Sequence, residues 1–272
     1  MFPLRDSNPT HRTPYVTLGL IAANVLIFLF WQPTFGGGEN PELAQQTFFW
    51  CRGEIPYEIT HQTALAEGGA EAARAIRGDY PGLPPRELQA HLDDECPQKS
   101  WLASLFVSMF LHGGWLHLAG NLLFLWIFGN NIEDRLGHVR YLLFYVAGGL
   151  AASALQVAIG PDSTIPNVGA SGAIAAVLGA YLFLYPQARV LTAVFFFFIT
   201  MVELPAILVL GIWFALQFLN GVGGLGSEVN GGVAHWAHVG GFAFGFAIAL
   251  AFLRRRVTPG GTWRGPLPPP PV

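Results

Sequence analysis

Charged residues are scarce in this sequence, and their scarcity excludes the ordinary soluble globular class. They make up only 11% of the 272 residues, whereas a typical soluble domain has about 25%. The net charge is −3, and no basic cluster of the kind that neutralises a phosphate backbone supports nucleic-acid binding. No small-residue cleavage site follows the first apolar segment, which excludes a signal peptide and favours a retained membrane helix.

Hydrophobic residues are abundant instead. They account for 52% of the chain, including 22 phenylalanines, and apolar stretches of roughly 20 residues, the length that spans a bilayer core, recur along it. The sequence therefore predicts a polytopic helical membrane protein. The block 190–219 is too long for one span, so an interfacial entry is expected before Pro205. Six spans are predicted, at residues 15–31, 116–130, 141–159, 171–186, from about 205 to 219, and 233–253.

The domain organisation follows from these apolar runs. Residues 1–14 are predicted to be a cytoplasmic tail, 15–256 the membrane domain, and the proline-rich residues 257–272 a disordered cytoplasmic tail. Residues 32–101 form an extracytoplasmic loop insertion with eleven acidic residues. Its Ala-, Glu- and Arg-rich pieces predict two short surface helices, at 63–77 and 85–95.

Arginine is distributed unevenly between the two sets of loops. The short loops before Ser171 and before the last span contain no Lys or Arg, whereas the opposite set holds nine arginines, at positions 5, 12, 135, 140, 189, 254, 255, 256 and 264. Because cytoplasmic loops are enriched in Lys and Arg, both termini are expected in the cytoplasm and the insertion outside. The predicted localisation is a bacterial plasma membrane.

One serine lies where a polar loop meets an apolar helix. The stretch Gly169-Ala170-Ser171-Gly172 follows a proline-broken loop and opens the fourth apolar run. N–H groups at a helix N-terminus lack intrahelical partners and carry partial positive charge, so they can receive an oxyanion formed by attack of this serine on a carbonyl. Taken alone, this stretch favours a helix-capping or packing role for Ser171.

Other spans supply the groups that a serine nucleophile needs. His238 lies inside the sixth span, where an ionisable residue indicates a functional site, and it enters the membrane from the same side as Ser171. In the second span, His117 and Asn121 are four residues apart, so they share a helix face. Both side chains can donate hydrogen bonds to a developing oxyanion. The three spans together favour peptide-bond hydrolysis over packing.

Small residues predict how two of these helices meet. Gly241 and Gly245 form a small-residue face on the sixth span, and Gly172 begins a similar face on the fourth. Such faces let helix backbones approach closely in a membrane. The fourth and sixth spans are therefore expected to pack against each other with Ser171 near His238.

These stretches resemble those of the rhomboid intramembrane serine proteases. The resemblance rests on His112–Asn121, Glu133–Gly137, Gly169–Gly172 and Ala237–Gly245. It implies an all-α polytopic membrane protein, a six-helix rhomboid bundle with an enlarged outer loop between helices 1 and 2. It also implies a serine-type endopeptidase that cleaves in or near transmembrane segments of membrane-protein substrates in the lipid bilayer. No cofactor and no metal are implied, and the oligomeric state is not predicted.

The resemblance also implies roles for single residues. Ser171 is the expected nucleophile and His238 the expected general base and acid, with no third acidic member. His117 and Asn121, together with the Ser171 N–H group, are the expected oxyanion hole, and His112 is expected to support the outer loop. The other supporting positions are four glycines: Gly169, Gly172, Gly241 and Gly245.

One matching stretch has a structural role in the family, and one position departs from some of its members. Glu133–Gly137 matches a structural turn of the family and stays outside the catalytic set. Ala175 stands one turn after Ser171, where some members carry an aromatic ring that stacks on the base histidine. The resemblance therefore does not define the orientation of the His238 ring.

Three other functions fit parts of the sequence. An inactive rhomboid-like protein that binds membrane-protein clients would be expected to lack Ser171 or His238, and both are present. The Gly-x-Ser-x-Gly elbow of soluble hydrolases fits poorly, because position 173 is alanine and no strand precedes the serine. A proton or metal transporter is disfavoured because no internal repeat is found. Its candidate residues would be His112, His117, Glu203, His235 and His238.

The two cysteines, Cys51 and Cys96, both lie in the insertion. Outside the cell oxidation is permitted, so a disulfide between them is favoured. A zinc site that adds His61 and His91 is the alternative, although its spacing matches no common pattern.

Overall fold

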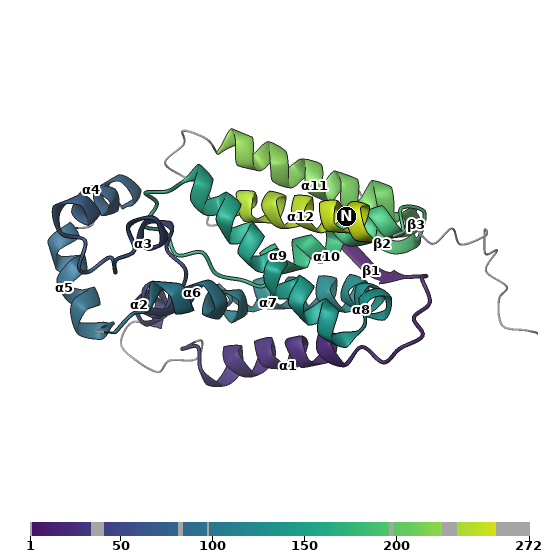
Figure 1. Ribbon diagram of the computed structural model, residues 1–272, viewed down its shortest axis with the longest axis horizontal. Coiled ribbons are helices and arrows are strands. Elements are labelled where there is room, and N and C mark those ends of the chain that lie inside the picture. Colours follow the sequence, from purple (N-terminus) through teal and green to yellow (C-terminus); the bar gives the residue numbers. More distant parts are fainter. Residues whose placement is uncertain are drawn as a thin grey trace, which may run out of the picture.

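A computed structural model describes residues 2–33, 41–80, 84–96, 98–195, 199–224 and 233–253 (Figure 1). The first half of the chain contains β1 (Phe2–Asp6), α1 (Tyr15–Phe30), α2 (Pro41–Arg52), α3 (Pro56–His61), α4 (Gly69–Asp79), α5 (Pro85–Glu95), α6 (Trp101–Val107) and the 3₁₀ turn η1 (Ser108–Phe110). The second half contains α7 (Trp115–Phe124), the π turn η2 (Leu125–Gly129), α8 (Asn130–Leu136), α9 (His138–Ile159), α10 (Ser171–Leu184), β2 (Arg189–Phe195), β3 (Ile199–Pro205), α11 (Ala206–Gly223) and α12 (His235–Phe252). Three segments lie outside the described residues: the predicted tail at 257–272, Arg254–Arg256, and most of the glycine-rich loop after α11.

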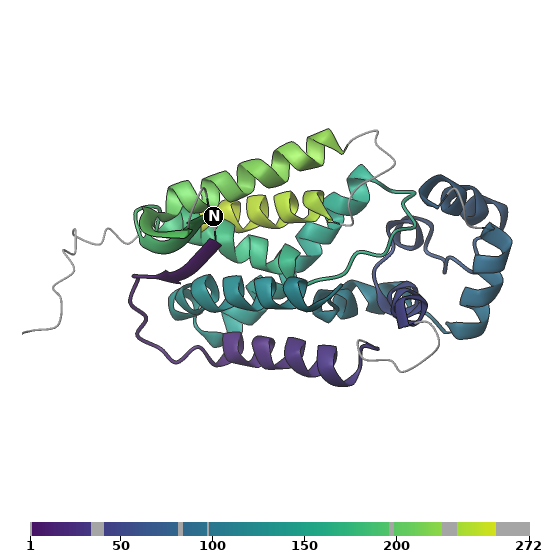
Figure 2. The ribbon, with the colours of Figure 1, turned by 180° about the vertical axis from the view of Figure 1, so that it is seen from behind.

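Helix α10 is the centre of the bundle. Nearly every residue from Gly172 to Leu184 is buried, and α9, α12 and the η2 turn pack around it (Figures 1 and 2). Its first two turns contain the small residues Gly172, Ala173, Ala175 and Ala176, so neighbouring backbones can approach closely. The helix begins at Ser171, as the sequence predicts.

Several helices are long and apolar enough to cross a membrane. Among the described residues, α9, α11 and α12 meet this criterion alone, and the pair Trp101–Phe110 and Trp115–Leu136, bent by 79°, meets it together. α1 and α10 are shorter apolar helices of 16 and 14 residues. The protein is an integral membrane protein, and α11 begins directly after Pro205, close to the predicted start of the fifth span.

The connection between the second and third predicted spans is mostly helical. The second span continues as helix through Leu136, and the chain reverses at Gly137, whose φ of 78° favours glycine. Glu133 is fully buried and accepts hydrogen bonds of 2.8 Å from the backbone N–H groups of Val16 and Thr17. These groups begin α1 and have no partner within that helix. Glu133 therefore caps α1, in agreement with a structural role for its motif.

A three-stranded antiparallel sheet replaces two features expected from the sequence. Strand β1, within the predicted 1–14 tail, pairs with β2, and β2 pairs with β3 in the segment predicted to be an interfacial entry. The fold is thus mostly helical but not all-α. The Asp6 carboxylate accepts hydrogen bonds from the Tyr181 hydroxyl at 2.7 Å and from Asn131 at 2.8 Å, which ties the strand to the bundle.

The 32–101 insertion has a hydrophobic cluster of its own at the end of the bundle opposite the sheet (Figures 1 and 2). The two predicted surface helices correspond to α4 and α5. Cys51 and Cys96 form a disulfide, so the zinc alternative is wrong, and His91 instead hydrogen-bonds the Thr47 hydroxyl at 3.0 Å. Within the same region Lys99 forms a buried ion pair of 2.6 Å with Glu58. The members of the cluster are Trp50, Ile55, Tyr57, Leu65, Ala72, Ile76, Leu88 and Leu92.

Replacing both cysteines with serine is expected to loosen this insertion selectively. The disulfide closes a sequence separation of 45 residues, and chain-entropy arguments give such a loop about 4 kcal/mol. Limited proteolysis should cut between α2 and α5 faster in the double variant than in the wild type, while fragments of the α9–α12 bundle stay protected. Equal cutting rates in the double variant and in oxidised wild type would contradict a stabilising role.

Candidate active site

The hydroxyl of Ser171 and the ring of His238 are in direct contact. Ser171 opens α10 and His238 lies in the first turn of α12, and Oγ is 2.7 Å from Nε2. The other ring nitrogen, Nδ1, is 2.8 Å from Oε1 of Gln217 on α11. Because an amide oxygen only accepts hydrogen bonds, Nδ1 carries the proton and Nε2 presents its lone pair to Ser171. This is the tautomer that a general base requires.

Helix α11 also provides an aromatic ring beside His238. The ring of Trp213 lies 5.7 Å from the imidazole, centroid to centroid. Ala175 is fully buried and offers no ring of its own. The orientation of the His238 ring, which the sequence does not define, is therefore set by Trp213 and Gln217 on the neighbouring helix α11.

Gly169 brings His117 close to Ser171. Its φ of 131° lies in the region that favours glycine. A Cβ atom at this position would stand 2.9 Å from Nε2 of His117 and 3.5 Å from Oγ of Ser171. Nδ1 of His117 accepts the N–H group of Gly113 at 3.2 Å, so in the neutral ring Nε2 carries the proton and can donate it toward the serine.

Asn121 lies one turn along α7 from His117. It is 7% exposed, and within the described residues its Nδ2 atom has no hydrogen-bond partner. A buried amide donor without a partner is costly. The side chain is therefore available to a polar group that arrives from outside.

His112 is buried in the break between η1 and α7. Its backbone N–H group donates to Oε1 of Gln32 at 3.0 Å, and its ring Nδ1 is 3.3 Å from the carbonyl oxygen of Phe110. Its ring lies 5.2 Å from that of His117, centroid to centroid. His112 thus holds the break and the end of α1 together, in keeping with a supporting position.

Close backbone packing brings Ser171 and His238 within reach of each other. A Cβ atom on Gly241 would overlap the carbonyl oxygen of Gly172, and one on Gly245 would overlap that of Ala176. α12 is therefore in backbone contact with α10 along the predicted faces, and the Gly172 peptide is part of that contact.

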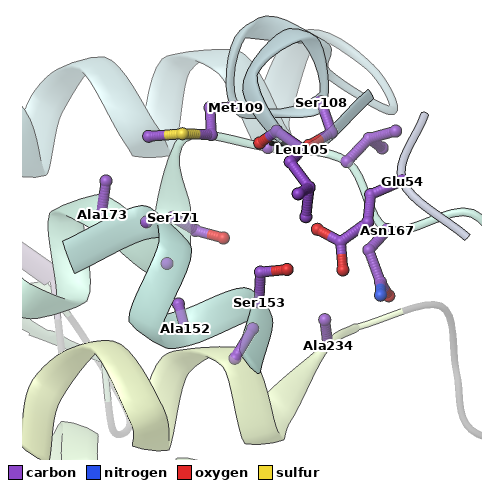
Figure 3. A pocket seen from close by; sticks show the side chains of 15 residues that line it. Glu54, Leu105, Ser108, Met109, Ala152, Ser153, Asn167, Ser171, Ala173 and Ala234 are labelled. Atoms are coloured by element: carbon purple, nitrogen blue, oxygen red, sulfur yellow. Dashed lines mark hydrogen bonds between the residues drawn. The ribbon is translucent and has the colours of Figure 1, made fainter. Parts of the chain in front are cut away.

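A small pocket of about 40 Å³ adjoins Ser171 (Figure 3). Its walls are mostly small residues of α9, α10 and the start of α12, closed on one side by Leu105 and Met109. Its polar lining side chains include those of Ser171, Ser153 and Glu54 (Figure 3). Glu54 belongs to the insertion, so this loop contributes directly to the pocket.

The remaining transporter candidates do not form a path across the bundle. His235 shares the Gln217 oxygen with His238 at 2.9 Å, whereas Glu203 lies in β3 at the opposite end and pairs with Arg189 at 3.7 Å. Among the described residues no group of three or more His, Cys, Asp or Glu side chains could hold a metal ion.

Sequence reasoning missed Gln217, Trp213 and Glu54. Gln217 could have been noticed as the lone strongly polar residue in the apolar stretch 206–219. No comparable signal marks Glu54, which is one of eleven acidic residues in the insertion.

The fold and the site together define a class: a helical membrane protein with a serine–histidine pair in the first turns of two apolar helices. Residues 99–255 match the rhomboid domain family. The chain therefore belongs to the rhomboid family.

Relatives with known names agree with this assignment. RHOMBOID-like protein 4 of Arabidopsis thaliana is 26% identical over 252 residues, 89% of this chain and 53% of the relative. Rhomboid protease GluP of Bacillus subtilis is 35% identical over 128 residues, 47% of this chain and 24% of the relative. Rhomboid-type serine protease 2 of Emericella nidulans is 29% identical over 177 residues, 64% of this chain and 31% of the relative. The chain thus spans about a quarter to a half of their lengths.

Proposed function

We propose that this protein is an intramembrane serine endopeptidase that cleaves membrane proteins in or near their transmembrane segments. The observation that carries the proposal is the 2.7 Å contact between Ser171 Oγ and His238 Nε2, with Nδ1 held by Gln217. A hydroxyl bonded to a base that a third group orients is the signature of an activated nucleophile. The protease names of two relatives, from Bacillus subtilis and Emericella nidulans, support the same reaction.

The reaction proceeds in two halves. Oγ of Ser171 attacks the scissile carbonyl carbon while its proton moves to Nε2 of His238. His238 then gives that proton to the leaving nitrogen, the C–N bond breaks, and an acyl-enzyme ester remains on Ser171. In the second half a water molecule attacks the ester carbonyl and passes a proton to His238, which returns it to Oγ as the acid product leaves.

His117 and Asn121 stabilise the negative charge on the carbonyl oxygen in each half. Nε2–H of His117 and Nδ2–H of Asn121 are donors on one face of α7, and the N–H group of Ser171 stands at the start of α10. Preorganised donors of this kind commonly contribute about 3 kcal/mol each to transition-state stabilisation.

The chain crosses the membrane six times with both termini in the cytoplasm. The proposed spans are the long apolar helices α9, α11 and α12, the bent pair, and the two shorter apolar helices α1 and α10. The arrangement is supported by the placement of the sheet, which includes the N-terminal strand, at the end of the bundle opposite the insertion (Figures 1 and 2). The arginine bias of the loops at the sheet end supports the orientation. The relatives come from a plant, a bacterium and a fungus, so the bacterial plasma membrane stays a prediction.

The alternative function is that of an inactive rhomboid-like protein that binds membrane-protein clients. Such a protein has no need of an activated serine. The hydrogen-bonded Ser171–His238–Gln217 arrangement therefore favours the protease.

Incubation with a single-span membrane protein in detergent tests the proposal. The wild-type protein should produce two fragments whose new ends, located by mass spectrometry, lie in or near the span, and a chelator should not slow the reaction. A serine-reactive phosphonate should label Ser171 and stop cleavage. Binding of the substrate without fragments and without labelling would instead indicate the client-binding alternative.

Replacing Gln217 with leucine is expected to slow cleavage without abolishing it. Nδ1–H of His238 would lose its hydrogen-bond acceptor, so the productive tautomer would no longer be held. We expect kcat to fall roughly ten- to a hundredfold with little change in KM. This loss is smaller than the roughly 10⁴-fold loss seen when a base is held in the wrong tautomer. Gln217→Glu keeps an acceptor oxygen at the same place and should restore most of the rate. Equal rates in the leucine variant and the wild type would show that Gln217 does not position His238.

A further inference from the structure

The insertion is docked onto the segment that leads into Ser171. The Asn167 N–H group donates to the carbonyl oxygen of Glu54 at 2.7 Å, and the Tyr57 N–H group donates to that of Ser163 at 2.9 Å. A Cβ atom on Gly53 would stand 3.1 Å from Pro166 and from Val168, so the two backbones are in close contact. Residues 53–57 are thus held against residues 163–168 of the loop that leads directly into Ser171.

This contact buries the Glu54 side chain. The residue is 4% exposed, and its Oε1 atom makes no hydrogen bond within the part of the chain that the structure describes. Burial raises the pKa of Glu54 above its usual value, while Ser153, Asn167 and Lys99 oppose that rise more weakly. A buried carboxyl group with an unsatisfied oxygen is costly unless a donor reaches it.

The unsatisfied oxygen belongs to a group that faces the pocket beside Ser171. In Figure 3 the Glu54 carboxyl group and the Ser153 hydroxyl point toward one another across the pocket, and the Ser171 hydroxyl enters it from α10. In a peptide substrate, the Cα atom of the residue before the scissile bond is bonded to the carbonyl carbon that Ser171 attacks, and the side chain of that residue branches from this Cα atom. When Ser171 attacks, this side chain must therefore lie within a few bond lengths of Oγ, at the entrance of the pocket.

The pocket is suited to a short side chain. Its volume of about 40 Å³ corresponds to roughly three water molecules. Gly149, Ala152 and Gly172 form walls without bulk. An aromatic ring would not fit, whereas a side chain of two or three heavy atoms would.

In the proposed protease reaction the substrate side chain preceding the scissile bond enters this pocket; resting on that function, we infer that Glu54 of the insertion selects a side chain that ends in a hydrogen-bond donor. A hydroxyl would supply the partner that Oε1 lacks. A carboxylate would bring a second acidic group against Glu54 in a buried site and should be rejected. The insertion would thus contribute a specificity-determining residue to a site otherwise built from the membrane helices.

A substrate series tests this inference in the wild-type protein without any enzyme variant. Single-span substrates that differ only in serine, alanine or aspartate before the mapped cleavage site should be cleaved in that order of kcat/KM. A hydrogen bond to a charged group is consistent with a serine preference of roughly tenfold or more over alanine. The aspartate substrate should be slower than alanine by a similar factor. Equal kcat/KM values for serine and alanine, or a preference for aspartate, would overturn the inference.

Glu54→Gln then assigns the preference to its residue. The substitution keeps the shape of the side chain and removes the charge, so the aspartate penalty should disappear and the preference for serine over alanine should shrink. Glu67→Gln makes the same change on an exposed part of the insertion and should leave all three rates unchanged. An unaltered order in Glu54→Gln would overturn the role of Glu54 alone. Absence of cleavage of every substrate by the wild type would overturn the proposed function and this inference with it.

Discussion

Replacing Ser171 with alanine is expected to lower the cleavage rate by roughly 10⁴- to 10⁶-fold, the range found when the nucleophile of a serine protease is removed. The residual hydrogen-bond donors cannot form an acyl-enzyme without Oγ. Replacing His238 with alanine should cost about as much, because Oγ would lose the base that accepts its proton at 2.7 Å. The two losses should not add in the double variant, because the residues act as a unit.

The measurement is the initial rate of fragment formation from a single-span substrate, with the melting temperature of each variant recorded beside it. Ser171→Ala removes a single oxygen atom at a helix terminus, so the fold should be retained. Ser7→Ala is the matched control, because it makes the same change at an exposed position that does not line the pocket. A Ser171→Ala protein that cleaves at a near wild-type rate would rule out the proposed mechanism.

Replacing Gly241 with leucine is expected to abolish activity and to destabilise the protein by about 3 kcal/mol or more, at the upper end of overpacking costs. The new side chain would overlap the carbonyl oxygen of Gly172, the residue after Ser171. Backbone atoms cannot rotate aside as a side chain can, so α12 and α10 must separate. That separation removes His238 from Ser171.

Gly19→Leu provides the matched control on α1. A Cβ atom at Gly19 meets nothing within 4 Å and the residue is exposed on the bundle surface, so the same substitution should leave activity and melting temperature nearly unchanged. If Gly241→Leu behaved like Gly19→Leu, the close contact of α12 with α10 could not be what brings Ser171 and His238 together.

The membrane helices could be predicted because their signal is local. A run of apolar residues of sufficient length requires satisfied backbone groups in lipid, and a helix satisfies them within its own segment. For the same reason the start of α10 at Ser171 and the start of α11 after Pro205 followed from neighbouring residues alone. The small faces containing Gly241 and Gly245 likewise predicted which helices would meet.

The sheet could not be predicted because its partners are far apart in the chain. β1 pairs with β2, nearly 190 residues later, and no property of Phe2–Asp6 indicates that partner. Apolar residues before Pro205 fit an interfacial segment as well as a hairpin. Only the positions of α10 and α11, which bring the ends of these segments together, decide between the two.

The sequence by itself determined that this protein lies in the membrane, that Ser171 opens a buried helix, and that His238 lies in another span near the same surface. Each of these conclusions depends on hydropathy or on a residue type within one segment. The tertiary structure alone decided which groups surround the serine: Gln217 and Trp213 reach His238 from α11, and Glu54 reaches the pocket from the insertion. These contacts depend on the angles at which separate helices and the insertion pack together. Such packing produces no periodic residue pattern within any single helix or loop, so it cannot be seen in the sequence.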